Sequence, residues 1–177
     1  MIKEIRNNMN VIESMIYFWT AVKDREKVGE RYLVELSEYP EMKLLYDESF
    51  NAESVRRSLS AITNREMLNG GTQKERQFWN NNMWMLEDLS LMSNMVAPLK
   101  VLNLDALPER IGKVKDIDVP SIEVIFIPAN KEEYFVVDNK LVINFFRVTP
   151  DLVLGGDPTI DGKPIMEYIE EKIIENF

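Results

Sequence analysis

The chain has 177 residues, of which 45% are hydrophobic and 29% are charged, a balance that excludes a disordered or fibrous protein. It contains no cysteine and no histidine, which excludes disulfides, the usual zinc sites, iron–sulfur ligation, cysteine nucleophiles and histidine-based triads. With 21 basic against 30 acidic residues, the formal net charge is −9. This charge argues against nucleic-acid and membrane partners, since phosphate contacts need clustered basic side chains.

The sequence also bears on location. Lys3, Glu4 and Arg6 lie where a secretory signal would need an uninterrupted apolar stretch. The longest charge-free apolar region, Leu89–Leu99, has 11 residues, whereas a membrane span needs roughly 20. We therefore expect a cytoplasmic protein.

The first half of the chain carries helical patterns. Apolar residues at alternating spacings of three and four form one stripe: Ile2, Ile5, Met9, Ile12, Ile16 and Trp19. This stripe predicts a helix over residues 2–22. A second helix is expected to begin near Asp24 as its N-cap and to reach about residue 38.

Further helices are expected after Pro40. A short turn should cover 42–46, and Asn51 should cap a helix that stops at the pair Gly70-Gly71. Thr72 and Glu75 have the spacing of a capping box, in which each side chain bonds the other residue's backbone amide. The helix that follows should run to about Met95 and stop before Pro98, which makes four main helices in 1–97.

The remainder of the chain has a different composition. Residues 98–120 should form an irregular connector with one helical turn near Pro108. Strands are predicted over 122–127, 134–137 and 141–146, with a tight turn at Asp138-Asn139. A turn at Asp161-Gly162 and a C-terminal helix complete the chain, with the helix presenting Ile165, Ile169, Ile173 and Phe177 inward.

These elements predict an α+β fold, in which an N-terminal bundle of about four helices packs against a small antiparallel sheet with a C-terminal helix. The chain divides into a helical lobe (1–97), a connector (98–120) and a sheet with its helix (121–177). The last part is expected to pack on the helices, in one integrated domain, because a β-rich piece under roughly 70 residues is marginal alone.

One segment stands out as a candidate contact site. Three asparagines lie between two tryptophans within a predicted helix, although asparagine is a poor helix former. Two interpretations remain open: a polar and aromatic contact surface or pocket, or asparagines that bond neighbouring helices or face water. The candidate ligand or partner contacts are Trp79, Asn80, Asn81, Trp84 and Asp88.

Two other patterns suggest ion binding. Arg56 and Arg57 could clamp an anion, although Arg57 also has the spacing to pair with Glu53 on a solvated helix face. The segment from Asp157 resembles a calcium loop but has Tyr168 where a glutamate is required, so a turn is the better interpretation. We expect no metal and no cofactor.

Three functions from different classes remain. The first is a non-catalytic protein-interaction or assembly module, which could form a homodimer. The second is a small-ligand-binding protein or a carboxylate-dependent enzyme, with a site between the helical and β parts. The third is an acidic mimic of nucleic acid, for which a net charge of −9 is modest. The absence of imidazole and thiol favours the first.

Overall fold

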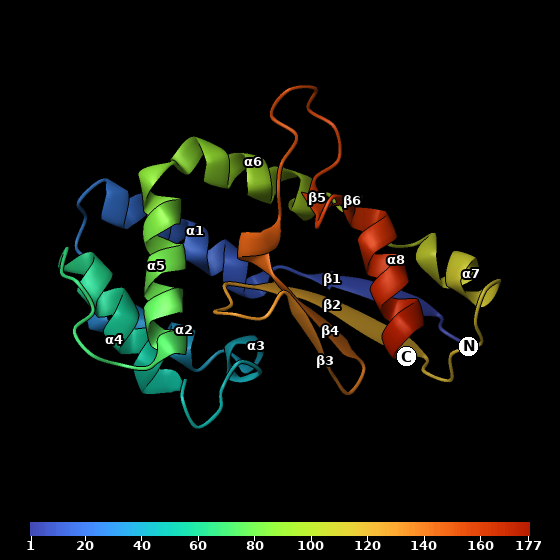
Figure 1. Ribbon diagram of the computed structural model, residues 1–177, viewed down its shortest axis with the longest axis horizontal. Helices are drawn as coiled ribbons and strands as arrows, with labels where there is room; N and C mark the ends of the chain where they lie inside the picture. Colours follow the sequence, from blue (N-terminus) through green and yellow to red (C-terminus); the bar gives the residue numbers. More distant parts are fainter.

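A mixed four-stranded sheet forms the centre of the computed structural model, which describes residues 1–177 (Figure 1). The strands lie in the order β1-β2-β4-β3. β1 pairs with β2 and β2 with β4 in parallel, while β3 and β4 form an antiparallel hairpin. Their bounds are β1 Glu4–Asn8, β2 Ser121–Ile127, β3 Tyr134–Val137 and β4 Lys140–Asn144.

The α+β class and the C-terminal helix are confirmed, but the sheet is not purely antiparallel as predicted. β4 is fully buried at Leu141, Val142 and Ile143, whereas every residue of β3 is partly exposed. The apolar strand therefore takes the interior position beside β2, and the hairpin places β3 at the edge. Because β4 rather than β3 pairs with β2, that pairing is parallel.

The prediction of a helix from residue 2 is wrong. Residues 4–8 form β1, and Ile5 lies opposite Ile122 with both side chains buried. Exposed Glu4 and Arg6 flank Ile5, which is the alternation of a strand. Over so few residues this alternation and the helical stripe share the same apolar positions, so spacing alone could not separate them.

The chain has eight helices, and the second main helix starts later than predicted. The second main helix begins at Glu30 rather than Asp24, because Asp24 ends α1 and Arg25 has a left-handed φ of 60°. The helices are α1 Asn10–Lys23, α2 Glu30–Ser37, α3 Pro40–Lys43, α4 Ala52–Thr63, α5 Gln73–Glu87, α6 Leu89–Lys100, α7 Leu107–Gly112 and α8 Ile165–Asn176.

Both predicted helix starts at Asn51 and Thr72 are confirmed, each as a capping box. α4 ends at Thr63, well before the glycine pair, because Arg65 adopts a left-handed φ of 57°. The Arg65 guanidinium also donates to the carbonyl of Val22 at 2.9 Å, which ties the end of α4 to α1.

The predicted helix 73–95 is two helices. Asp88 breaks it with an extended φ of −141°, and its side chain accepts from the Leu91 amide at 2.9 Å, which starts α6. α6 then continues through Pro98 to Lys100, five residues beyond the predicted end near Met95. The expected helical turn near Pro108 is confirmed as α7.

The core connects all of these elements. Its buried hydrophobic residues form a single cluster of 46, which includes Ile5 of β1, Trp19 of α1 and Ile169 of α8. A second small hairpin, β5 (Thr159–Ile160) with β6 (Lys163–Pro164), precedes α8, and the predicted turn at Asp161 and Gly162 connects its strands with positive φ at both residues. None of the helices has both the length and the apolar character needed to cross a membrane.

Candidate functional site

Three of the predicted contact residues form an exposed face at the end of α5. Asn80, Trp84 and Asp88 are spaced by four residues and all three are exposed, with Trp84 at 62%. Asp88 lies just beyond α5 and its carboxylate is used as the cap of α6. The face is convex, since it is the outer side of a helix, and Trp84 supplies its only large apolar group.

The other two predicted contact residues are partly buried and turn toward the protein. The Asn81 side-chain amide donates to the carbonyls of Ala129 and Asn130 at 3.3 and 3.2 Å, which ties α5 to the end of β2. Trp79 packs against the core, and its ring nitrogen is buried without a partner. The bonds of Asn81 agree with the second interpretation of this segment, in which the asparagines bond neighbouring parts of the fold.

Asn82 makes the most buried polar contact of the segment. Its side-chain oxygen accepts from the Trp19 ring nitrogen at 3.0 Å, and its nitrogen donates to the Phe78 carbonyl at 2.9 Å. Asn82 and Trp19 are both fully buried. This pair fixes α5 against α1 and leaves no polar group of Asn82 available to a ligand.

Arg56 and Arg57 lie beside a shallow cavity of about 380 Å³, but Arg57 already has a partner. Its guanidinium lies 3.5 Å from the Glu75 carboxylate on α5, rather than pairing with Glu53 as its spacing suggested. Partial burial would raise the pKa of Glu75, but hydrogen bonds from Thr72 and Ser54 and the charge of Arg57 hold that pKa below its ordinary value. The cavity also contains Glu30, Glu53 and Glu66, so its acidic side chains outnumber the two arginines.

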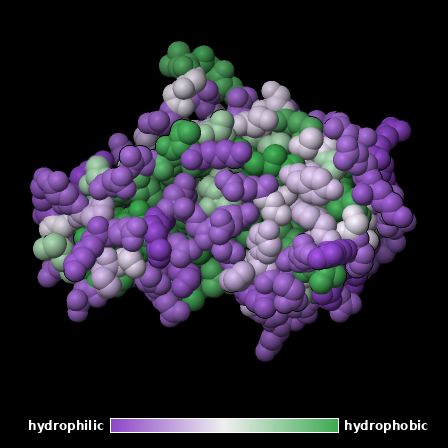
Figure 2. Space-filling model, turned by 180° about the vertical axis from the view of Figure 1, so that it is seen from behind, coloured by the Kyte–Doolittle hydropathy of each residue, from purple (hydrophilic) through white to green (hydrophobic).

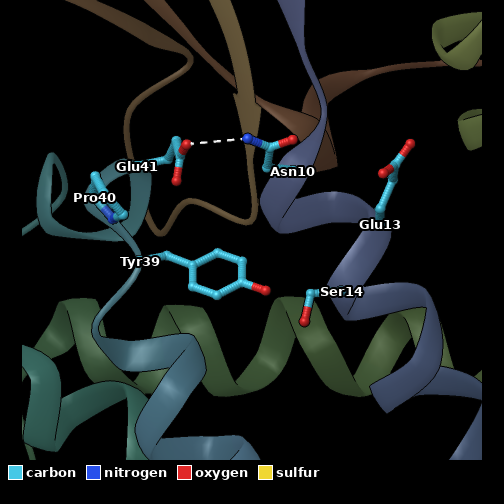
Figure 3. Close-up of a pocket in the computed structure, with 6 residues that line it drawn as sticks. All are labelled: Asn10, Glu13, Ser14, Tyr39, Pro40 and Glu41. Carbon is cyan, nitrogen blue, oxygen red and sulfur yellow. Dashed lines mark hydrogen bonds between the residues drawn. The ribbon is translucent and has the colours of Figure 1, made fainter.

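A polar cleft of about 500 Å³ opens between the start of α1 and the α2–α3 junction (Figure 3). Asn10, Glu13 and Ser14 line one side, and Tyr39, Pro40 and Glu41 line the other. The Glu41 carboxylate accepts from the side-chain amides of Asn8 at 3.2 Å and Asn10 at 3.4 Å. Neither Glu13 nor Glu41 forms an ion pair, and no group of three or more acidic residues is placed to hold a metal ion.

The most unusual surface feature is a loop over residues 150–158, here called the apolar loop. It projects from the body beside β5 and β6 in Figure 1, and Figure 2 shows a hydrophobic projection above a largely hydrophilic surface. Two backbone hydrogen bonds of 2.8 Å between Thr149 and Thr159 close its base. Its tip is formed by Leu152, Val153 and Leu154, which are 64%, 90% and 87% exposed.

The tip is ordered around one carboxylate. One oxygen of Asp151 accepts from the amides of Val153 and Leu154 at 3.1 and 3.0 Å, and the other accepts from the Gly156 amide at 3.2 Å. The Gly155 amide also donates to the Asp151 carbonyl at 3.1 Å. These bonds satisfy the backbone amides on the inner side of the turn. The three apolar side chains are exposed on its outer side.

Glycine suits two positions of this turn. Gly155 has a φ of +68°, which other residues adopt only with strain. A Cβ on Gly156 would lie 2.9 Å from the Asp151 carboxylate oxygen that its amide binds. The segment Asp-Leu-Val-Leu-Gly-Gly therefore specifies a defined conformation that displays its apolar residues.

Sequence reasoning identified the turn after Asp157 but not the apolar loop. Three aliphatic residues are too few to show a helical or strand period, so their pattern did not indicate burial or exposure. The signal that was available is their position between turn-forming residues, Pro150 and Asp151 before them and Gly155 and Gly156 after them. Loop tips are usually small or polar, so an apolar tip is itself informative.

The order of the apolar loop should depend on pH through Asp151. Hydrogen bonds from the amides of Leu154, Gly156 and Val153 hold the pKa of Asp151 below its ordinary value of 3.8. A depressed pKa means that the bonds are fully present above pH 3.8 and are lost as the pH falls through the lower, folded value. In an NMR titration, the Val153, Leu154 and Gly156 amide signals should move together at that lower pH. Movement of these signals at or above pH 3.8 would contradict the arrangement.

In comparisons with protein-family models, curated proteins and solved structures, none matches the chain.

Proposed function

We propose that the protein is a non-catalytic protein-interaction module that uses the apolar loop as its main contact. The observation that supports this proposal is the exposure of three consecutive aliphatic side chains at the tip of a closed, hydrogen-bonded projection. Single exposed apolar residues are ordinary, but a contiguous apolar patch on a folded protein is typical of an interaction site. The projecting shape suits insertion into a concave partner surface.

The energetics favour such a contact. Burying a leucine or valine side chain that is otherwise exposed contributes about 1.5–3 kcal/mol. The loop offers three such side chains, and its bonds to Asp151 already hold the backbone in place. A preordered loop loses less conformational entropy on binding, so more of the burial free energy remains as affinity.

Site-specific photocrosslinking tests the proposal. A photoreactive amino acid placed at Val153 of the full chain should form adducts with a discrete partner protein in cells of the source organism. The double substitution Leu152→Ser with Leu154→Ser should lower the adduct yield at least tenfold, because most of the buried apolar area is lost (about 3–6 kcal/mol by burial). The substitutions should leave the unfolding midpoint unchanged, since both side chains are exposed.

Val101 provides the matched control, because it is 81% exposed and lies at the end of α6, as its C-cap, rather than on the apolar loop. A photoreactive residue at Val101 should give only a diffuse background. Equal adducts from both positions, or a Val153 adduct whose yield survives the double substitution, would refute the proposal.

A further inference from the structure

We infer that the apolar loop binds a protein surface that is apolar at its centre and basic at its rim. This inference rests on the proposed function and adds the chemistry of the partner. Between Val148 and Gly162 the chain has three aspartates and no lysine or arginine. Within the apolar loop itself, Asp151 and Asp157 are the only charged residues, and the nearest cation along the chain, Arg147, lies two residues before the base of the loop and donates to the Lys131 carbonyl.

The three aspartates are not equivalent. The Asp151 carboxylate is occupied by backbone amides and acts as a positioning residue for the tip. Asp157 and Asp161 are exposed and form no hydrogen bond or ion pair through their carboxylates, so both charges face solvent. Asp157 is three residues from Leu154, which places the two α-carbons within about 11 Å of each other.

These acidic residues favour some classes of binding partner over others. A second copy docking tip to tip would bring six aspartates together, which opposes association. An anionic membrane would repel the same charges, and loops that insert into membranes usually carry basic flanks. A protein pocket that is apolar at its centre would bury the tip, and lysine or arginine at its rim would attract the aspartates beside the tip.

Electrostatics and burial predict different responses to salt. A contact made by apolar burial alone is unchanged or strengthened at high salt, whereas attraction between opposite charges at a rim is screened. When the Val153 crosslinking is repeated in an extract of the same cells, raising NaCl from about 0.05 to about 0.5 M should lower the adduct yield about fivefold. At about 0.05 M NaCl, the adduct yield of the combined Asp157→Asn and Asp161→Asn variant should be about fivefold below that of the wild type. Raising the salt concentration should then change this yield little.

Asp118→Asn is the matched control, since Asp118 is an exposed aspartate outside the apolar loop. It should keep both the wild-type yield and the wild-type salt response. Mass spectrometry of the adduct should place the crosslinked peptide among apolar residues with lysine or arginine nearby.

The outcomes separate this inference from the proposed function. A site-specific protein adduct that is insensitive to salt and to the two Asp→Asn changes would overturn the basic rim while leaving the interaction function standing. Adducts formed chiefly with lipid or with a second copy of the chain would also overturn the inference. Loss of any difference between Val153 and Val101 would overturn both.

Discussion

Replacing Asn82 with alanine is expected to lower the free energy of unfolding by about 2–4 kcal/mol. The substitution leaves the ring nitrogen of fully buried Trp19 without its acceptor at 3.0 Å and also opens a small cavity beside it. An unsatisfied buried donor bears its full desolvation cost, which exceeds the net contribution of an ordinary hydrogen bond. Urea unfolding followed by far-UV circular dichroism measures the change without relying on Trp19 fluorescence.

Asn80→Ala is the matched control in the same helix. Asn80 is exposed and its side chain makes no hydrogen bond, so alanine should raise the free energy of unfolding by a few tenths of a kcal/mol through its higher helix propensity. The two asparagines should therefore respond with opposite signs. Equal responses would show that Asn82 does not bridge α5 and α1.

Ile5→Ala is expected to lower the free energy of unfolding by about 2–4 kcal/mol. Ile5 lies in β1, is 4% exposed and faces fully buried Ile122 of β2. Ile16→Ala on α1 is the control. Because Ile16 is only partly buried, this substitution should lower the free energy of unfolding by less than Ile5→Ala does.

Urea unfolding measures both changes, and NMR chemical shifts distinguish strand from helix at the N-terminus. In the wild-type chain, the 13Cα and 13Cβ chemical shifts of residues 4–8 should have strand values, while those from Asn10 onward should have helical values. Helical shifts throughout 4–22, with only a small effect of Ile5→Ala, would show that β1 does not form.

Features that depend on near neighbours could be predicted from the sequence. Thr72 and Glu75 cap α5 because their partners lie three residues apart. Asp138 and the pair Asp161-Gly162 adopt the positive φ that their hairpins need, as their residue types indicated. In each case the interaction closes within a few residues, so the local sequence contains both partners.

Less of the candidate site than of the fold could be predicted from the sequence. The prediction that the asparagine segment contains contact residues stays a prediction, and Asn80, Trp84 and Asp88 are its exposed members. Asn81 and Asn82 each make one local bond, with Gln77 and Phe78, but their other bonds reach groups that lie 48 or more residues away in the chain. Spacing within a helix gives the face on which a residue lies, but not the group that meets that face.

The sequence alone determined that the chain folds with helices and strands of the α+β kind, that Asn51 and Thr72 cap helices, where the hairpin turns lie, and that thiol and imidazole chemistry are excluded. Only the tertiary structure decided that residues 4–8 form a strand, that Asn82 bonds Trp19, and that Leu152, Val153 and Leu154 remain outside the core. The reason is physical. Caps and turns are fixed by hydrogen bonds between near neighbours, whereas strand pairing and burial depend on partners supplied by distant parts of the chain.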